Sequence, residues 1–190
     1  MSYQFTRSEA GLGWFGAGNT LGWSSPFGLA PGDAGTASPP LDRRSETNIA
    51  TLKSWVQPVA RQFIQALRGR GIDARVISGT RSYDEQNALY AQGRTTPGRI
   101  VTNARGGYSN HNFGIAFDIG IFDNGRYLPQ SPLYAEAGPI GKSFGLSWGG
   151  DWVSFRDEPH YQLRPAWAAN LSEGAMLTEL RRRIAAGQPI

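Results

Sequence analysis

The sequence predicts a single α+β domain in which helices flank a small antiparallel sheet. The chain has 190 residues, a length typical of one domain. Amphipathic helical patterns alternate along it with a few short apolar runs of strand type. The longest of these runs is followed by Asp123-Asn124-Gly125, a strong hairpin signal, so we expect its strands to pair antiparallel.

The first elements follow from local signals between residues 42 and 91. A helical pattern begins at Asp42 and ends at Gly69, and Pro58 interrupts it, so we expect either a kink or two abutting helices. Residues 75–79 form a short apolar run that predicts a buried strand. Ser82, with Glu85 three residues later, is a capping-box pattern that predicts a helix through about residue 91.

The later elements are predicted in the same way. Residues 93–107 are rich in loop-forming residues, and residues 115–122 predict a strand. Ser131-Pro132 predicts the start of a helix that reaches toward Phe144. A last strand over residues 160–163 leads to a C-terminal helix after Ser172.

Two flanking regions differ from this central part, residues 41–165. Residues 1–40 form a Gly-rich arm that carries the large aromatics Trp14, Phe15, Trp23 and Phe27. We expect these aromatics to pack on the domain rather than to bind the wall or a partner. Residues 166–190 predict a basic amphipathic helix whose apolar face packs on the domain. Contact of that helix with an anionic wall or outer-membrane surface is the alternative.

Composition excludes several classes of protein. The chain has no cysteine, which rules out a disulfide scaffold, a thiol nucleophile, thiolate zinc fingers and iron–sulfur sites. A net charge of +4 suits a polyanionic partner, either nucleic acid or a bacterial wall polymer. Nucleic acid is not expected, because no aromatic–basic or groove-reading motif accompanies the charge.

No targeting or membrane segment is evident in the sequence. The first residues contain no apolar run of secretion-signal length, and no window approaches the ~20 apolar residues of a membrane span. We therefore expect a monomer that is made in the cytoplasm without a signal peptide and does not insert stably into a membrane. Action elsewhere would need another route of release.

His111 and Asp118 are residue types that bind zinc. They lie seven residues apart, where a polar turn runs into an apolar strand, so a regular strand would place them on opposite faces. They converge only if the backbone bends between them, and Gly114 permits this. Taken alone, the spacing is more typical of an exposed loop histidine and a strand-end aspartate.

His160 and Asp157 complete a possible catalytic set. A catalytic zinc site has three protein ligands, an open position for water and a nearby carboxylate base. His160 is the second of only two histidines, and Asp157 lies three residues before it. Together with His111 and Asp118, they provide three ligands and a base with no residue left over.

These motifs resemble those of a known family. Ser109-x-His111-x-x-Gly114-x-Ala116-x-Asp118 is similar to the S-x-H-x-x-G-x-A-x-D signature of the zinc D-alanyl-D-alanine carboxypeptidase and L-alanyl-D-glutamate peptidase family. That family includes wall-remodelling enzymes, vancomycin-resistance D,D-dipeptidases and many phage endolysins. Three further stretches resemble family motifs in the right order: residues 78–82, 148–152 and 157–160.

The resemblance implies a hedgehog/D,D-peptidase-like fold, with residues 41–165 as a zinc peptidase domain. It implies that His111, Asp118 and His160 hold one Zn²⁺. Asp157 stands where the L-alanyl-D-glutamate branch has an aspartate base and the D,D-peptidase branch has a glutamate. The adjacent Glu158 is a weaker rival for that role.

The resemblance also implies roles around the metal. Arg81 matches the arginine that faces the substrate carbonyl or carboxylate in relatives. Ser109 is expected to contact substrate or to support a ligand, and Trp148 is expected to lie near the site. Asp151 either orients a ligand histidine or has a surface or turn role.

The expected activity is hydrolysis of a peptidoglycan stem peptide at the L-Ala–D-Glu bond. Asp157 and residues 149–152 favour this branch. The alternatives are a D,D- or L,D-carboxypeptidase and a zinc-bearing, non-catalytic wall-binding module, although an intact Asp157 and Arg81 argue against the module. A wall hydrolase without a signal suggests a phage endolysin that causes bacteriolysis, or a toxin injected into a neighbouring periplasm.

Overall fold

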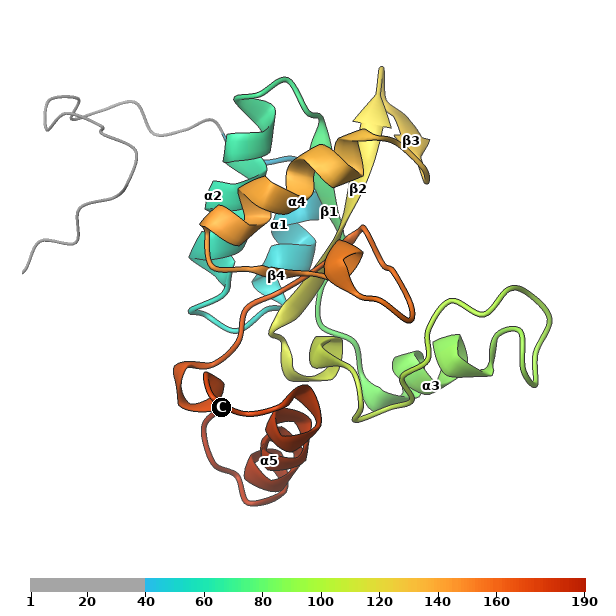
Figure 1. Ribbon diagram of the computed structural model, residues 1–190, viewed down its shortest axis with the longest axis vertical. Helices are drawn as coiled ribbons and strands as arrows, with labels where there is room; N and C mark the ends of the chain where they lie inside the picture. Colours follow the sequence, from blue (N-terminus) through green and yellow to red (C-terminus); the bar gives the residue numbers. More distant parts are fainter. Residues whose placement is uncertain (1–39) are drawn as a thin grey trace, which may run out of the picture. The chain divides into compact units, whose positions relative to one another are not determined.

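The computed structural model describes residues 40–190 (Figure 1). The arm expected over residues 1–40 therefore lies outside the described residues, apart from its last position. The described elements are, in order, α1 (Arg43–Ala50), α2 (Gln57–Arg68), β1 (Ala74–Ser78), α3 (Tyr83–Ala91), the 3-10 turn η1 (Asn110–Phe113), β2 (Ala116–Asp123), β3 (Arg126–Leu128), α4 (Leu133–Ser143), β4 (Ser147–Trp148), η2 (Gly149–Asp151), β5 (His160–Gln162), η3 (Ala166–Ala168) and α5 (Glu173–Ala185).

The sheet is antiparallel at every strand pair, as the sequence predicts. Its order is β1-β2-β5-β4, and β3 pairs with β2. Two register positions matter for the site, since Asp118 on β2 lies opposite His160 on β5 and opposite Ser78 on β1. Residues that are far apart in the sequence are thereby brought to one region of the sheet.

The helix starts follow the local signals. The side chain of Asp42 accepts from the amide of Ser45 at 2.9 Å and caps α1. Pro58 lies in the first turn of α2, where its missing N–H costs nothing, so the interrupted pattern forms two helices rather than one kinked helix. Ser82 and Glu85 form the predicted capping box of α3.

The core lies between the sheet and helices α1, α2 and α4, which lie beside one another in Figure 1. Phe63 of α2 is fully buried against Tyr161 of β5, with ring centroids 4.6 Å apart, and against Phe117 of β2 at 6.4 Å. Burying an aromatic side chain of this size stabilises a fold by about 1.5–3 kcal/mol. Both strands that carry site residues are therefore fixed to α2.

The C-terminal helix α5 buries its apolar stripe, formed by Met176, Leu177 and Leu180. Its basic side chains have partners of their own: Arg182 and Arg183 both pair with Glu179. Figure 1 places α5 and α3 toward the end of the sheet where β2 begins. None of the helices in residues 40–190 has the length and apolar character needed to cross a bilayer.

Candidate metal centre

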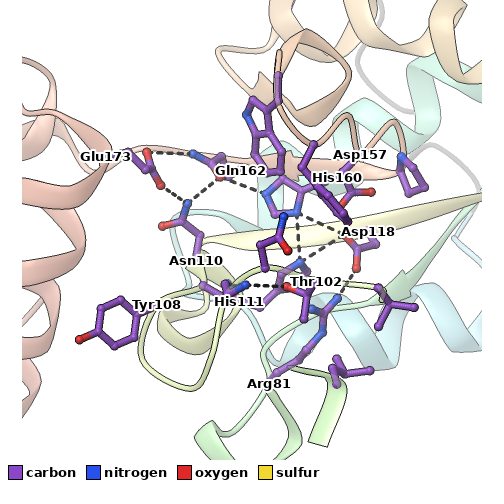
Figure 2. A pocket seen from close by; sticks show the side chains of 18 of the residues that line it. Arg81, Thr102, Tyr108, Asn110, His111, Asp118, Asp157, His160, Gln162 and Glu173 are labelled. Carbon is purple, nitrogen blue, oxygen red and sulfur yellow. Dashed lines mark hydrogen bonds and ion pairs between the residues drawn. The ribbon is translucent and has the colours of Figure 1, made fainter. Parts of the chain in front are cut away.

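Three predicted ligands converge at one point of the sheet (Figure 2). The Nε2 atom of His111 lies 3.2 Å from Oδ1 of Asp118 and 3.2 Å from Nδ1 of His160. The same Nδ1 and Oδ1 atoms are 3.3 Å apart. The three atoms therefore form a nearly equilateral triangle. Both imidazole rings are almost completely buried.

Local structure explains how residues seven apart come to face the same point. Ser109 caps the 3-10 turn η1, which carries His111. The turn ends at Gly114, whose φ of +68° reverses the chain into β2. Asp118 then lies opposite His160 in the sheet register. The bend predicted at Gly114 is therefore present.

The donor atoms fit a metal ion. The Nδ1 atom of His111 lies 2.7 Å from the carbonyl oxygen of Gly79, and Nε2 of His160 lies 3.0 Å from Oε1 of Gln162. Since oxygen atoms only accept there, each outer nitrogen carries the proton and each inner nitrogen presents a lone pair. Two lone pairs and a carboxylate oxygen then face one point, which favours a cation. Tetrahedral ligands at zinc bond lengths of about 2.0–2.1 Å lie roughly 3.3–3.4 Å apart, close to the observed triangle.

The electrostatics keep the carboxylate ionised. Burial alone would raise the pKa of Asp118, but the two histidines hold that pKa well below its usual value. Burial lowers the pKa of His111, so this imidazole favours its neutral form. Burial would lower the pKa of His160, but the adjacent carboxylates of Asp118 and Asp157 and the contact with Gln162 together raise it above its usual value.

Asp157 lies beside His160 and lines the same groove (Figure 2). Its carbonyl oxygen accepts from the amide of His160 at 3.1 Å, so a tight turn links the two residues. Burial raises the pKa of the Asp157 carboxyl, and the nearby charge of Asp118 adds to this rise. Glu158 is not among the residues that line the groove, and its carbonyl oxygen accepts from Nε1 of Trp148 at 2.7 Å.

Arg81 contacts the centre through one ligand. Its Nη2 donates to Oδ2 of Asp118, the oxygen that does not face the histidines. Its Nε and Nη1 groups donate to Ser78 at 3.1 Å and to Gln86 at 3.2 Å. Three of the five guanidinium N–H groups are thus used, and two remain for a ligand in the groove.

The other predicted residues divide into two groups. Ser109 lines the groove, and its Oγ accepts from the amide of His111 at 3.4 Å. Trp148 and Asp151 do not line the groove. Asp151 is exposed and pairs with Lys142 at 2.9 Å, so it orients neither histidine; this fits its alternative surface role.

The groove that contains the triangle has a volume of about 910 Å³. It is lined by Tyr127 of β3 and also by Leu177 of α5, and Figure 1 shows these elements at opposite ends of the sheet. Trp152 also lines it, with its ring centroid 4.9 Å from that of His160. The lining of the groove therefore extends from the triangle toward both of these elements.

Sequence reasoning missed the groups that hold the ligand histidines. The carbonyl of Gly79 holds His111, and Gln162 holds His160. Gln162 lies two residues after His160 on one strand, so side-chain alternation would have placed both on one face. Asn110 and Glu173 contact Gln162 in turn, and no local pattern marks Glu173.

Fold and site together define a class of protein: α+β domains with a buried His–Asp–His group that could hold a metal ion in an open groove. A family model described as D-alanyl-D-alanine carboxypeptidase matches residues 102–163, which include the three predicted ligands and Asp157. The chain is 40% identical over 127 residues to the peptidoglycan L-alanyl-D-glutamate endopeptidase CwlK of Bacillus subtilis (strain 168), covering 59% of this chain and 75% of that protein. The chain belongs to this peptidase family, which confirms the resemblance seen in its motifs.

The chain is also similar to a phage peptidase and to two solved structures. The chain is 27% identical over 123 residues to the L-alanyl-D-glutamate peptidase of Listeria phage A118, covering 63% of this chain and 40% of that protein. The crystal structure of Serratia marcescens L-Ala D-Glu endopeptidase ChiX matches with a TM-score of 0.49 and 26% identity, covering 64% of this chain and 86% of that one. A Zn(II) complex of the vancomycin resistance D,D-pentapeptidase VanY matches with a TM-score of 0.49 and 20% identity, covering 68% of this chain and 83% of that one.

Proposed function

We propose that the protein is a zinc-dependent endopeptidase that hydrolyses the L-Ala–D-Glu bond of peptidoglycan stem peptides. The observation that carries the proposal is the triangle of two imidazole lone pairs and one carboxylate oxygen beside Asp157. The similarity to CwlK, whose name states this activity, supports the proposal. An aspartate rather than a glutamate at position 157 favours the same branch.

His111, Asp118 and His160 would hold one zinc ion. When bound, zinc supplies a polarised scissile carbonyl and a water whose pKa falls toward about 7. Asp157 takes a proton from the attacking water as the new C–O bond forms. It then delivers a proton to the leaving amine as the C–N bond breaks. Burial raises the pKa of its carboxyl, which makes Asp157 a stronger base for this proton.

Arg81 stabilises the charge that develops on the carbonyl oxygen. Its contacts with Ser78, Gln86 and Asp118 fix the guanidinium and leave two N–H groups for the substrate. Removing one such preorganised donor typically costs about 3 kcal/mol of transition-state stabilisation. Ser109 is proposed to contact the substrate because it lines the groove.

The second candidate is a carboxypeptidase that removes a terminal D-Ala. The description of the matching family model favours it. A groove whose lining reaches both β3 and α5 favours the endopeptidase, because a terminal cut needs only one open side. A zinc-bearing, non-catalytic wall-binding module would have no use for Asp157 and Arg81 beside the ligands.

The proposed setting is the bacterial wall. Residues 41–165 would form the peptidase domain and residues 166–190 a helix packed on it, in a monomeric protein. The similarity to a phage peptidase supports release in the manner of an endolysin, which causes bacteriolysis. Injection into a neighbouring periplasm is the alternative route.

Mass spectrometry of purified peptidoglycan digested by the full chain tests the activity. We expect glycan-linked L-Ala and peptides that begin with D-Glu, lost with a chelator and restored by zinc. Release of terminal D-Ala alone would assign the carboxypeptidase. No product from folded, zinc-loaded protein would overturn both and leave the wall-binding module.

A further inference from the structure

A chain of hydrogen bonds links the metal centre to the first residue of α5 (Figure 2). Oε1 of Gln162 accepts from Nε2 of His160 at 3.0 Å and from Nδ2 of Asn110 at 2.6 Å. Glu173 lies at the other end of this hydrogen-bond network. Its Oε1 accepts from Nδ2 of Asn110 at 2.5 Å, and its Oε2 accepts from Nε2 of Gln162 at 3.4 Å.

The carboxylate of Glu173 sets the donor and acceptor of every hydrogen bond in this network. An ionised carboxylate only accepts hydrogen bonds, so both amides must turn their NH₂ groups toward Glu173. The carbonyl oxygen of Gln162 must then face His160. An oxygen at that position requires the proton of the imidazole to be on Nε2. The remaining nitrogen, Nδ1, therefore presents its lone pair to the centre.

The reverse arrangement is unfavourable at each step. A flipped Gln162 would place its NH₂ group against that of Asn110, and its oxygen against the carboxylate of Glu173. Asn110, His160 and Gln162 are all at least nine-tenths buried, so water cannot easily repair such clashes. One charged side chain thus selects one pattern for the whole network.

We propose that Glu173 is a positioning residue that fixes the Nε2–H tautomer of His160 through Gln162 and Asn110, and so prepares Nδ1 for the metal. This inference rests on the proposed zinc site. Arg164 holds Glu173 in place with an ion pair of 2.9 Å. Glu173 lies beyond residues 102–163, the part matched by the family model, so the C-terminal helix contributes to the centre from outside that part.

The isosteric variant Glu173→Gln tests the proposal. An amide at position 173 presents an NH₂ group to one of its two amide neighbours in either orientation, so the acceptor pattern is lost while the shape is kept. We expect the zinc dissociation constant, measured by competition with a chromogenic chelator, to rise about 10–100-fold. The matched control is Glu179→Gln, which removes an ion-paired glutamate from the same helix without touching the network. Its zinc affinity should be unchanged.

A swap of the two side chains separates hydrogen-bond direction from charge. In Gln162→Glu/Glu173→Gln, the carboxylate at 162 accepts from His160, from Asn110 and from the amide at 173. The tautomer is therefore kept although the ion pair with Arg164 is lost. We expect the zinc dissociation constant of the swap to lie within about threefold of the wild-type value, which is clearly smaller than the rise of at least tenfold expected for Glu173→Gln. If the swap binds zinc as weakly as Glu173→Gln, the ion pair matters and the proposal is wrong.

Nitrogen NMR of ¹⁵N-histidine-labelled, metal-free protein, recorded at a pH where the ring is neutral, reads the tautomer directly, because the chain has only two histidines. In the wild type and the swap, we expect His160 as one species with a protonated Nε2. In Glu173→Gln, we expect a second His160 species, while His111, held by the carbonyl of Gly79, serves as the internal reference. One His160 species together with unchanged zinc affinity in Glu173→Gln would overturn the inference. Wild-type protein that binds no zinc would instead overturn the proposed metal site.

Discussion

The backbone of Gly149 is in direct contact with the backbone of Asp157. The amide of Asp157 donates to the carbonyl oxygen of Gly149 at 3.0 Å. A Cβ atom on Gly149 would lie 2.4 Å from the carbonyl oxygen of Asp157 and 3.0 Å from Cβ of His160. The glycine thus sets the position of the turn that carries both the proposed base and a proposed metal ligand.

Gly149→Ala should push this turn away from the centre. We expect a loss of about 1–3 kcal/mol in the free energy of unfolding from the overpacking. Activity should fall by about 10²-fold, because a displacement near 1 Å is enough to misalign reacting groups. Urea unfolding and peptide hydrolysis measure the two effects. Gly69→Ala is the control, since its φ of −60° suits alanine and its nearest neighbours lie at 3.5 Å; an equal loss there would contradict the explanation.

Titration of the buried Tyr134 phenol should lower the free energy of unfolding at alkaline pH. Its hydroxyl accepts from the amide of Ile121 and donates to the carbonyl of Leu128, which joins α4 to the β2–β3 hairpin. Burial raises the pKa of this phenol to about 12. The unfolded chain loses the phenol proton near pH 10 and the folded chain only near pH 12, so stability is complete below pH 10 and falls as pH rises toward 12. The loss is on the order of 2–3 kcal/mol.

Comparison with Tyr134→Phe isolates this effect from other groups that titrate in alkali. The variant is less stable at pH 7 because it loses two hydrogen bonds, but its gap to the wild type should narrow between pH 10 and 12. Urea unfolding at a series of pH values measures the gap. A gap that stays constant would show that the phenol does not titrate differently in the folded state.

Much of the fold could be predicted because its signals are local. The capping box at Ser82, the proline at position 58 and the glycine at position 114 each act within a few residues of where they stand. The convergence of the three proposed ligands could be expected in part, since their chemistry and motif spacing lie within residues 109–160. Their convergence needed the pairing of Asp118 with His160, which hydrophobic patterns alone do not set.

The rest depends on contacts between distant residues. The carbonyl of Gly79 that holds His111 is a backbone group, so no side-chain pattern marks it. Glu173 reaches the centre only because α5 packs near the start of β2, although it resembles an ordinary first-turn glutamate in the sequence. Asp151 shows the opposite case, because a carboxylate within a family motif pairs with a surface lysine instead.

Asp157→Asn should retain zinc but lose turnover. The amide keeps the shape of the side chain and cannot take the proton of the attacking water, so kcat should fall by about 10²–10⁴-fold. Stem-peptide hydrolysis gives kcat, and chelator competition gives zinc affinity. Glu158→Gln is the matched control, since Glu158 is not among the residues that line the groove. A larger loss in Glu158→Gln than in Asp157→Asn would transfer the role of base to Glu158.

Zinc should stabilise the folded protein through His111. A ligand that binds only the folded state adds about 2.7 kcal/mol at a concentration of 100 times its Kd. We therefore expect zinc to raise Tm in the wild type and in Asp157→Asn, and a chelator to reverse this rise. His111→Ala removes one corner of the triangle, so its Tm should be insensitive to zinc. Since the variant also loses the bond to Gly79, its metal-free Tm must be measured first, and the zinc-dependent shift is the quantity compared. An undiminished shift in His111→Ala would place the bound zinc elsewhere.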